Sequence, residues 1–331
     1  MTIDQYADAV DLRIFLDLLQ KISRFEALEG HIYAARSGYT MTDHKLMHRE
    51  LGIEKLLAFD EDEELSKRQR FNKPTSECRC TIRSLDEFCS DPTTVIEEEN
   101  FNQGPMIVWI KEARWHKLSE LLRHFETLVS LLQPMSIVRV TIAADILDWA
   151  GREPDLSSRR TISRLREDAL EQLRSQLGDY IDPSFGVSNM QQNGFGSALS
   201  EAFGVAADRA VPTSGTSSFE PLSLVEFDSE TKMLSLTGMI VPEQQRDALH
   251  ARLTVGHWPF LSNSWSDVKG VLLPDLTVRE RLTLEFYAGQ GKAAADDGLR
   301  FDIDVATEKP GFFENFAAFH RYYPVLLSAE L

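Results

Sequence analysis

The sequence predicts an α/β protein with a doubly wound, mainly parallel sheet that ends in an antiparallel hairpin. Three observations predict this fold class. Short strand segments alternate with helical segments five times between residues 29 and 145. Most of these strands are apolar almost throughout, as expected where helices cover both faces of a parallel sheet. Further along the chain, two segments in which apolar and polar residues alternate flank a short polar turn, which is typical of a hairpin.

The elements of the alternating part follow from local patterns. A helix over residues 8–28 comes first, because Val10, Ile14 and Leu18 recur at helical spacing. Asp43 adds negative charge to the first turn of the next helix, and Gly52 is suited to cap its end. The strands are expected at residues 31–35, 53–59, 77–82, 106–110 and 137–142. The helices after them are expected at residues 42–52, 63–71, 85–88 and 118–132.

The second half of the chain differs in character. The hairpin is expected to pair residues 222–227 with 233–240, and a mainly helical C-terminal region follows it, with helices over 243–253, 277–288 and 311–328. The predicted organisation has five parts: an N-terminal helix (1–28), the core (29–145), a helical insertion and loop (146–217), the terminal hairpin of the sheet (218–241) and the helical C-terminal region (242–331).

Composition excludes several classes of protein. The 331 residues carry 35 basic and 52 acidic side chains, a formal charge of −17, which disfavours a protein that mainly binds nucleic acid. A neutral small-molecule ligand or a protein partner fits that charge better, and whether the chain forms a homo-oligomer stays open. No apolar run is long enough for a membrane span, and the first residues do not resemble a secretory signal, so a cytoplasmic location is expected. Cys78, Cys80 and Cys89 are then expected to be reduced core thiols.

Three further patterns have both a structural and a functional interpretation. The arginines of residues 146–215 either contact an anionic ligand or, as we favour, pair with nearby acids on a solvated helix face. His44 and His48 have metal-ligand spacing, but no third ligand accompanies them, so we predict exposed histidines and no metal site. Gly194-Phe195-Gly196 follows no strand, and a plain helix-entry loop is therefore favoured over a phosphate loop.

A strand that ends in an acid carries the most specific motif. The segment Lys55–Leu65, with Asp60 at the strand end, and the following Arg68, Phe71 and Asn72 resemble the second motif of class I S-adenosylmethionine-dependent methyltransferases. In that family the acid holds both ribose hydroxyls of the cofactor, and Asp60 is the matching residue. A carboxylate suits this role because it accepts two hydrogen bonds from adjacent hydroxyls. The alternative is that Asp60 is only the polar first residue after a strand.

A wider pattern is similar to a group called putative O-methyltransferases. It comprises Ile32-Tyr33, Gly38, Met41-Thr42-Asp43-His44, Leu46-Met47 and residues 68–72. The resemblance implies a Rossmann-like core and S-adenosylmethionine (SAM) as cofactor. Tyr33, Ser37 and Gly38 would line the cofactor mouth, since ligands bind at the carboxyl ends of such strands. Asp86 matches the third motif, which contacts adenine; the alternative is an acid that only favours a helix start.

The sequence departs from this family at two motifs. The first motif is normally a glycine-rich turn, but here the strand ends Ala34-Ala35-Arg36-Ser37-Gly38 with one glycine. The fourth motif normally places an acid after the fourth strand, where this chain has Lys111-Glu112. Lys111 in that place disfavours metal-assisted O-methylation, and Glu112 is available as a base. Lys111 and Glu112 are therefore the predicted acid and base, with a solvated pair as the alternative.

Two functions remain open at this stage. The first is a methyltransferase-like protein that binds SAM and methylates an unidentified acceptor, with oxygen favoured as the acceptor atom. The second is a catalytically degenerate protein of the same fold, a pseudoenzyme that acts as a sensor or as the protein-interaction subunit of a larger complex. Methyl transfer would support the first, and cofactor binding without turnover the second.

Overall fold

One eight-stranded sheet organises the molecule. The computed structural model describes residues 3–112, 114–145, 162–188, 194–211, 216–228, 232–255 and 257–324. The strand order is β3-β2-β1-β4-β5-β7-β6-β8. Strands β1 to β5 are parallel, β7 is antiparallel to both β5 and β6, and β8 is parallel to β6. The predicted doubly wound, mainly parallel sheet that ends in an antiparallel hairpin is confirmed.

The strands have the following bounds: β1 Ile32–Ala35, β2 Lys55–Asp60, β3 Arg79–Ile82, β4 Met106–Glu112, β5 Ile137–Ala143, β6 Ser217–Asp228, β7 Met233–Pro242 and β8 Lys269–Leu272. Alternate residues of a strand enter different cores, because successive side chains point to opposite faces of a sheet. In β1, Tyr33 and Ala35 belong to one hydrophobic cluster, and Ile32 and Ala34 belong to the other.

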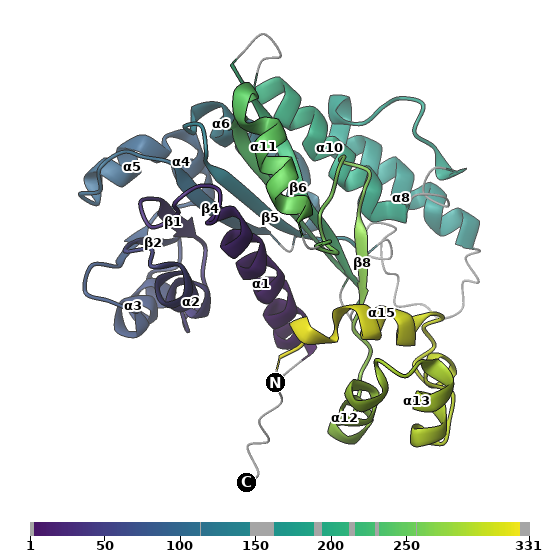
Figure 1. The fold of residues 1–331 in the computed structure, drawn as a ribbon. Coiled ribbons are helices and arrows are strands. Elements are labelled where there is room, and N and C mark those ends of the chain that lie inside the picture. Colours follow the sequence, from purple (N-terminus) through teal and green to yellow (C-terminus); the bar gives the residue numbers. More distant parts are fainter. Residues whose placement is uncertain are drawn as a thin grey trace.

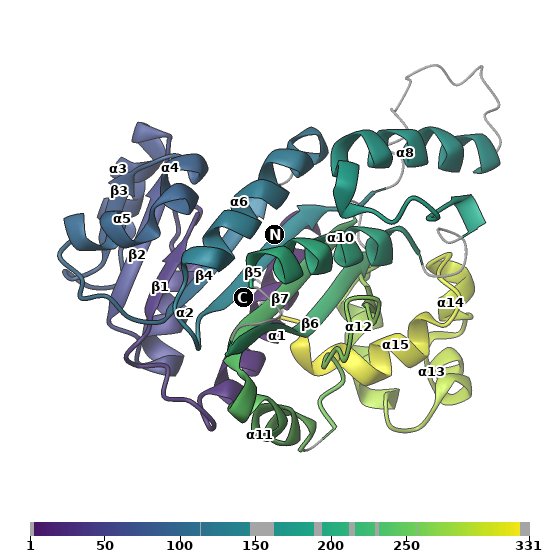
Figure 2. The ribbon, with the colours of Figure 1, turned by 90° about the horizontal axis from the view of Figure 1, so that it is seen from above.

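Helices cover both faces of the sheet, so the core has three layers (Figure 1 and Figure 2). On one face lie α1 Ile3–Ile22, α2 Thr42–Leu51 and α11 Glu243–Thr254. On the other lie α4 Leu85–Ser90, α5 Pro92–Glu98, α6 Leu118–Leu131, α8 Ile162–Leu177 and α10 Gly194–Ala210. Helix α3, Glu63–Asn72, packs against β2 and β3. Short 3-10 helices span Trp115–Lys117, Gly178–Tyr180 and His320–Tyr322.

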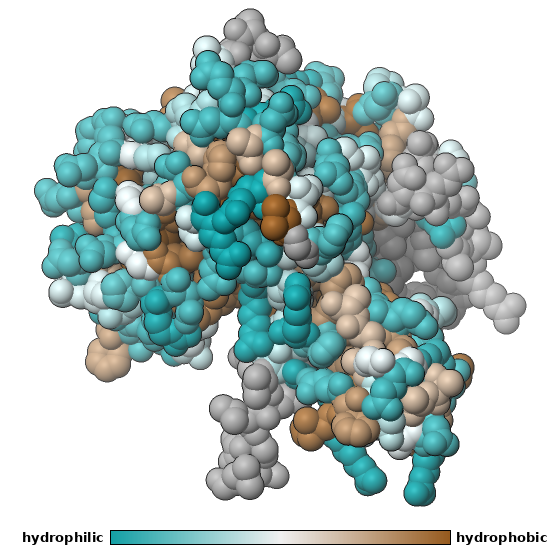
Figure 3. Space-filling model, in the orientation of Figure 1, coloured by the Kyte–Doolittle hydropathy of each residue, from teal (hydrophilic) through white to brown (hydrophobic). Residues whose placement is uncertain are grey.

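The C-terminal region forms a group of helices beyond β8. It contains α12 Val278–Tyr287, α13 Lys292–Leu299, α14 Ile303–Ala306 and α15 Phe312–Phe319. Figure 3 shows apolar side chains gathered at this end of the molecule. Val278, Leu282 and Phe286, four residues apart on α12, are 49%, 60% and 70% exposed. Among the described residues, no helix is long and apolar enough to cross a membrane.

Several element boundaries differ from the predicted ones. Strand β4 continues through Glu112 rather than ending at residue 110, because both added residues stay paired with β5. Helix α1 ends at Ile22, and turns replace its expected last residues. Strand β8 was not expected, since its four residues, Lys269–Leu272, show no alternating pattern. The helix expected over 311–328 ends at Phe319 as α15, and a 3-10 helix follows to Tyr322. Its last expected residues, 325–328, lie outside the described residues.

Two glycine predictions have a clear outcome. Gly52 caps α2 with a φ of 68°, and its amide donates to the carbonyl oxygens of His48 and Met47, as expected. The Gly194–Gly196 segment lies within α10 rather than before it. A Cβ on Gly196 would come within 2.4 Å of the Glu226 carboxylate on β6. Close packing against a strand therefore explains Gly196, and an acid beside it is unsuited to a phosphate site.

The cysteines agree with the sequence expectation of free thiols. Cys78 and Cys89 are buried and Cys80 is half-buried, and none of the three forms a disulfide. Of the arginines noted between residues 146 and 215, Arg152, Arg159 and Arg160 lie outside the described part of the chain.

Candidate active site

The carboxyl ends of β3, β2, β1 and β4 meet along one edge of the sheet, and two cavities open there. Consecutive residues at the strand ends line different cavities, because they point to opposite faces. Arg36 and Glu112 line the cavity on the face of α6, which we call the α6-side cavity. Ser37 and Lys111 line the cavity on the face of α1, which we call the α1-side cavity.

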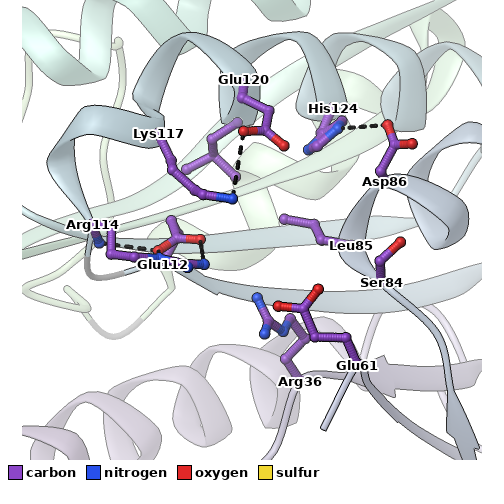
Figure 4. Close-up of a pocket in the computed structure, with 11 residues that line it drawn as sticks. Arg36, Glu61, Ser84, Leu85, Asp86, Glu112, Arg114, Lys117, Glu120 and His124 are labelled. Atoms are coloured by element: carbon purple, nitrogen blue, oxygen red, sulfur yellow. Dashed lines mark hydrogen bonds and ion pairs between the residues drawn. The ribbon is translucent and has the colours of Figure 1, made fainter.

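The α6-side cavity is small and strongly charged (Figure 4). Its volume is about 60 Å³, and its lining consists of Arg36, Glu61, Ser84, Leu85, Asp86, Glu112, Arg114, Lys117, Glu120, Leu121 and His124. Most of the charged groups form ion pairs across or along its wall, including Lys117 with Glu120 at 3.7 Å. The space is thus closed by long side chains rather than by backbone.

Asp60 lies at the end of β2, where the sequence predicts a ribose ligand. It is 7% exposed. One carboxylate oxygen accepts a hydrogen bond from the amide of Asp62 at 3.0 Å, and the other accepts one from Arg36 at 3.4 Å. The contact with Arg36 is long for a charged pair. Lone pairs of the carboxylate therefore remain available at the edge of the sheet, directly beside a residue that lines the α6-side cavity.

Asp86 lies in the first turn of α4 and also lines the α6-side cavity. Ser84 builds this helix start: its hydroxyl accepts from the Glu87 amide at 3.2 Å, and Glu87 accepts in return from the Ser84 amide at 2.7 Å. Asp86 Oδ1 lies 3.0 Å from His124 Nε2 on α6. Asp86 is thus a helix-start acid that also lines the cavity, and its contact with adenine stays a prediction.

Glu112 is a firmly held carboxylate. It is 7% exposed, and Arg114 donates to it from Nε at 2.7 Å and from Nη2 at 2.8 Å. Burial alone would raise the pKa of Glu112, but the hydrogen bonds and charge of Arg114 outweigh burial and lower it. Because Lys111 lines the other cavity, Lys111 and Glu112 do not face a common space. A pair acting jointly on one acceptor does not fit this arrangement.

The α1-side cavity is larger, about 340 Å³. Its lining consists of Asp8, Ala9, Leu12, Ser37, Gly38, Thr40, Thr42, Asp43, Trp109 and Lys111. Lys111 Nζ lies 3.5 Å from Asp8 Oδ1 of α1 and 4.2 Å from the centre of the Trp109 ring. The cavity therefore has an aromatic wall, a cation on β4 and acids on α1 and α2.

Asp43 is a site residue that the sequence suggested as a helix-start acid and as part of the wider family pattern, without a role at the site. Its Oδ2 accepts from the Tyr33 hydroxyl at 2.9 Å and from the Ser37 hydroxyl at 2.5 Å. Tyr33, predicted at the cofactor mouth, is fully buried and meets the α1-side cavity through Asp43. Ser37 and Gly38 line that cavity directly. The local signal for Asp43 was its position in the first turn of α2, two residues after the N-cap residue Met41.

His44 is fully buried, and the expectation of an exposed histidine was wrong. Its ring packs edge-on against Tyr33 at 4.9 Å between ring centres, and Nδ1 lies 3.3 Å from Asp43 Oδ1. Burial would lower the pKa of His44 and raise that of Asp43, but their mutual attraction reverses both shifts. Among the described residues, no group of three or more potential ligands could hold a metal ion.

Helix α3 holds the loop between β1 and α2 in place. Buried Gln69 donates to the carbonyl oxygen of Ser37 at 2.6 Å, and Asn72 donates to that of Tyr39 at 2.9 Å. Met41 takes the left-handed conformation, with a φ of 54°. Side-chain donors from α3 therefore shape a loop that would otherwise depend on a glycine-rich turn.

Comparisons with known proteins identify a family. The family model described as "Putative O-methyltransferase" matches residues 6–331. The solved structures that match include a 16S rRNA (adenine(1408)-N(1))-methyltransferase from Catenulisporales acidiphilia with the cosubstrate SAM, at 12% identity, covering 73% of this chain and 93% of that chain, with a TM-score of 0.32. They also include a plantazolicin methyltransferase in complex with a desmethylPZN analog and SAH. It is 12% identical, the match covers 70% of this chain and 84% of that chain, and the TM-score is 0.33. No curated protein matches the chain.

Proposed function

Because the chain belongs to the family described as "Putative O-methyltransferase", we propose that it binds SAM at the carboxyl ends of β1 to β4 and methylates an acceptor oxygen. The observation that carries this proposal is the convergence of the predicted cofactor residues on one sheet edge. Ser37 and Gly38 line the α1-side cavity and Asp86 lines the α6-side cavity. Asp60 ends β2, directly before Glu61, which lines the α6-side cavity. Such an edge is where doubly wound sheets bind nucleotides.

The hydrogen-bond acceptors at this edge suit the adenosine half of the cofactor. Asp60 would accept from the two ribose hydroxyls, and Asp86 would lie at the adenine end. The α6-side cavity is smaller than a purine, so Arg36 would have to turn outward on binding, while Arg114 stays on Glu112. Arg36 is a long side chain whose contact with Asp60 is long, 3.4 Å, so this movement gives up only a weak interaction.

The apolar part of the α1-side cavity, along Ala9 and Leu12 of α1, is the proposed place of the acceptor. When bound, SAM supplies an electrophilic methyl group on a sulfonium. The protein's task is then to align an acceptor oxygen with that methyl and to exclude water. Trp109 and Leu12 provide apolar walls for this, and Lys111 is the predicted acid or base that lines the same space. Glu112, held by Arg114 on the other face, would position Arg114 instead.

Calorimetric titration of SAM tests this proposal. We expect SAM to bind the wild type and to bind Asp60→Asn at least about 10-fold more weakly, because an amide replaces a carboxylate that accepts from both hydroxyls. Asn keeps the side-chain volume and can still accept from the Asp62 amide. No binding to the wild type at millimolar SAM would overturn the proposal. Binding without transfer to any acceptor would leave the degenerate sensor or interaction subunit.

A matched control separates the ribose contact from loop geometry. Asp182 also accepts from the amide two residues on, that of Ser184 at 2.7 Å, and is exposed. Asp182→Asn makes the same chemical change in the same kind of turn, away from both cavities. We expect this variant to bind SAM as the wild type does.

A further inference from the structure

We propose that Lys111 and Asp43 together bind the amino-acid end of SAM, with Lys111 at its carboxylate and Asp43 at its ammonium group. The inference rests on the proposed function and assigns Lys111 a binding role in place of the predicted role in proton transfer. An α-amino acid carries one charge of each sign, and a cavity that recognises it needs both complementary charges at separate points of its wall.

The α1-side cavity has that distribution of charge. Lys111 contributes an ammonium group from the end of β4, and Asp43 contributes a carboxylate from the first turn of α2. The two residues are 68 positions apart in the chain but line one space of about 340 Å³. Attraction to Lys111 is among the causes that lower the pKa of Asp43, which agrees with this placement.

The Asp43 carboxylate is already oriented by its neighbours before any cation binds. Tyr33 and Ser37 donate hydrogen bonds to one of its oxygens, and His44 lies 3.3 Å from the other. These partners fix the orientation of the carboxylate, and only 12% of its side chain is exposed. A carboxylate held in this way loses little freedom when it accepts a further hydrogen bond, and charged hydrogen bonds are the strong ones.

The same geometry decides which end of the amino acid goes where. A free helix start would attract the ligand's carboxylate, but Asp43 already places negative charge in the first turn of α2. That charge repels a second carboxylate and attracts an ammonium group. Lys111 provides a cation to the lining of the same cavity, is 36% exposed and lies over the Trp109 ring. Its present partner, Asp8, is 49% exposed, so a ligand carboxylate can compete with that weak pair.

Three ligands test the assignment by calorimetry. They are SAM, decarboxylated SAM, which keeps the sulfonium and the ammonium group but lacks the carboxylate, and methylthioadenosine, a neutral thioether that lacks the amino-acid chain and the sulfonium charge. We expect Lys111→Met to weaken SAM about 10- to 100-fold and to leave the other two unchanged. Asp43→Asn should weaken SAM and decarboxylated SAM by a similar factor and leave methylthioadenosine unchanged. Unchanged binding of methylthioadenosine also shows that each variant is folded.

The outcomes separate this inference from the proposed function. Failure of the wild type to bind any of the three ligands would overturn the proposed function and this inference with it. Normal wild-type binding with equal losses for SAM and methylthioadenosine, or with no loss at all, would overturn the inference alone. Lys232→Met is the matched control, because Lys232 is 42% exposed and pairs with Asp228 at 3.6 Å but lines neither cavity. That variant should bind all three ligands as the wild type does.

Discussion

Near the candidate site, buried neighbouring side chains rather than solvent decide the charge states of His44 and Asp43. His44 and Asp43 are adjacent in the chain, and both are enclosed beside Tyr33 and Ser37. Burial by itself lowers the pKa of His44, but the charge of Asp43 and the hydrogen bond to it outweigh burial and raise that pKa. The imidazolium is therefore favoured in the folded state, and this has a consequence for stability.

We expect the free energy of unfolding to decrease as the pH rises through the folded-state pKa of His44. A raised pKa means that the folded state binds this proton more tightly than the unfolded chain. The contribution is thus fully present below the unfolded value of about 6.5 and is lost above the folded one. Urea unfolding from about pH 5.5 to about pH 9 measures it. His44→Asn should flatten the dependence.

A matched histidine controls for the general effect of removing an imidazole. His257 is exposed, and His257→Asn should keep the wild-type pH dependence. Identical slopes for the wild type and His44→Asn would contradict the expected role of the His44–Asp43 pair.

At the scale of secondary structure, the carboxyl end of β4 and the side chains of α3 shape the site. Because β4 runs two residues further than its apolar run, Lys111 and Glu112 point to opposite faces and reach different cavities. Helix α3 contributes no cavity residue, but Gln69 and Asn72 hold the loop that does. The loop's shape therefore depends on a helix that follows it in the chain.

Removing the donor of Gln69 should loosen that loop. Gln69→Met keeps the length of the side chain and leaves the Ser37 carbonyl oxygen without its partner at 2.6 Å. We expect a loss of about 1 to 3 kcal/mol in the free energy of unfolding and weaker binding of SAM. Chemical denaturation and calorimetry of the same preparation measure the two effects.

The control for this variant is Gln290→Met. Gln290 also donates from Nε2 to a backbone carbonyl oxygen, that of Phe286 at 3.2 Å, but it is exposed. We expect little change in either measurement. If Gln69→Met lowered stability and left SAM affinity unchanged, the loop's binding geometry would not depend on α3.

At the scale of the whole molecule, a buried ion pair joins α1 to the middle of the sheet. Arg139 on β5 has no exposed surface, and it donates to Asp11 of α1 and, at 2.5 Å, to Thr237 of β7. Burial lowers the pKa of Arg139, with the charge of Asp11 opposing that shift. Since α1 also provides Asp8 and Leu12 to the α1-side cavity, this pair helps to fix one wall of the site.

Removing only one partner of the Asp11–Arg139 ion pair should lower the stability of the protein strongly. Asp11→Ala leaves a buried, unpaired guanidinium, and we expect a loss of about 3 to 5 kcal/mol in the free energy of unfolding. The double variant Asp11→Leu with Arg139→Met removes both charges and should recover much of that loss. Denaturant unfolding compares the variants.

An exposed pair provides the reference for this measurement. Glu63 and Lys67 pair on α3 at 3.1 Å with 66% and 53% of their side chains exposed. Glu63→Ala should change the free energy of unfolding by less than about 1 kcal/mol. A double variant at Asp11 and Arg139 that is no more stable than Asp11→Ala would show that charge is not what the pair contributes.

The sequence by itself determined the strand–helix alternation, the hairpin, the Gly52 cap and Asp60 at a strand end, because each depends on residues close together in the chain. Only the tertiary structure decided which distant residues meet. Lys111 and Asp43 share a cavity because β4 lies beside β1 in the sheet, and His44 is buried because α2 packs against Tyr33. Strand β8 is stabilised by its pairing with β6 rather than by a pattern of its own. Helices and strands can be predicted from the spacing of apolar residues that are neighbours in the chain. Strand order and burial depend on contacts between distant residues, which form only when the chain folds.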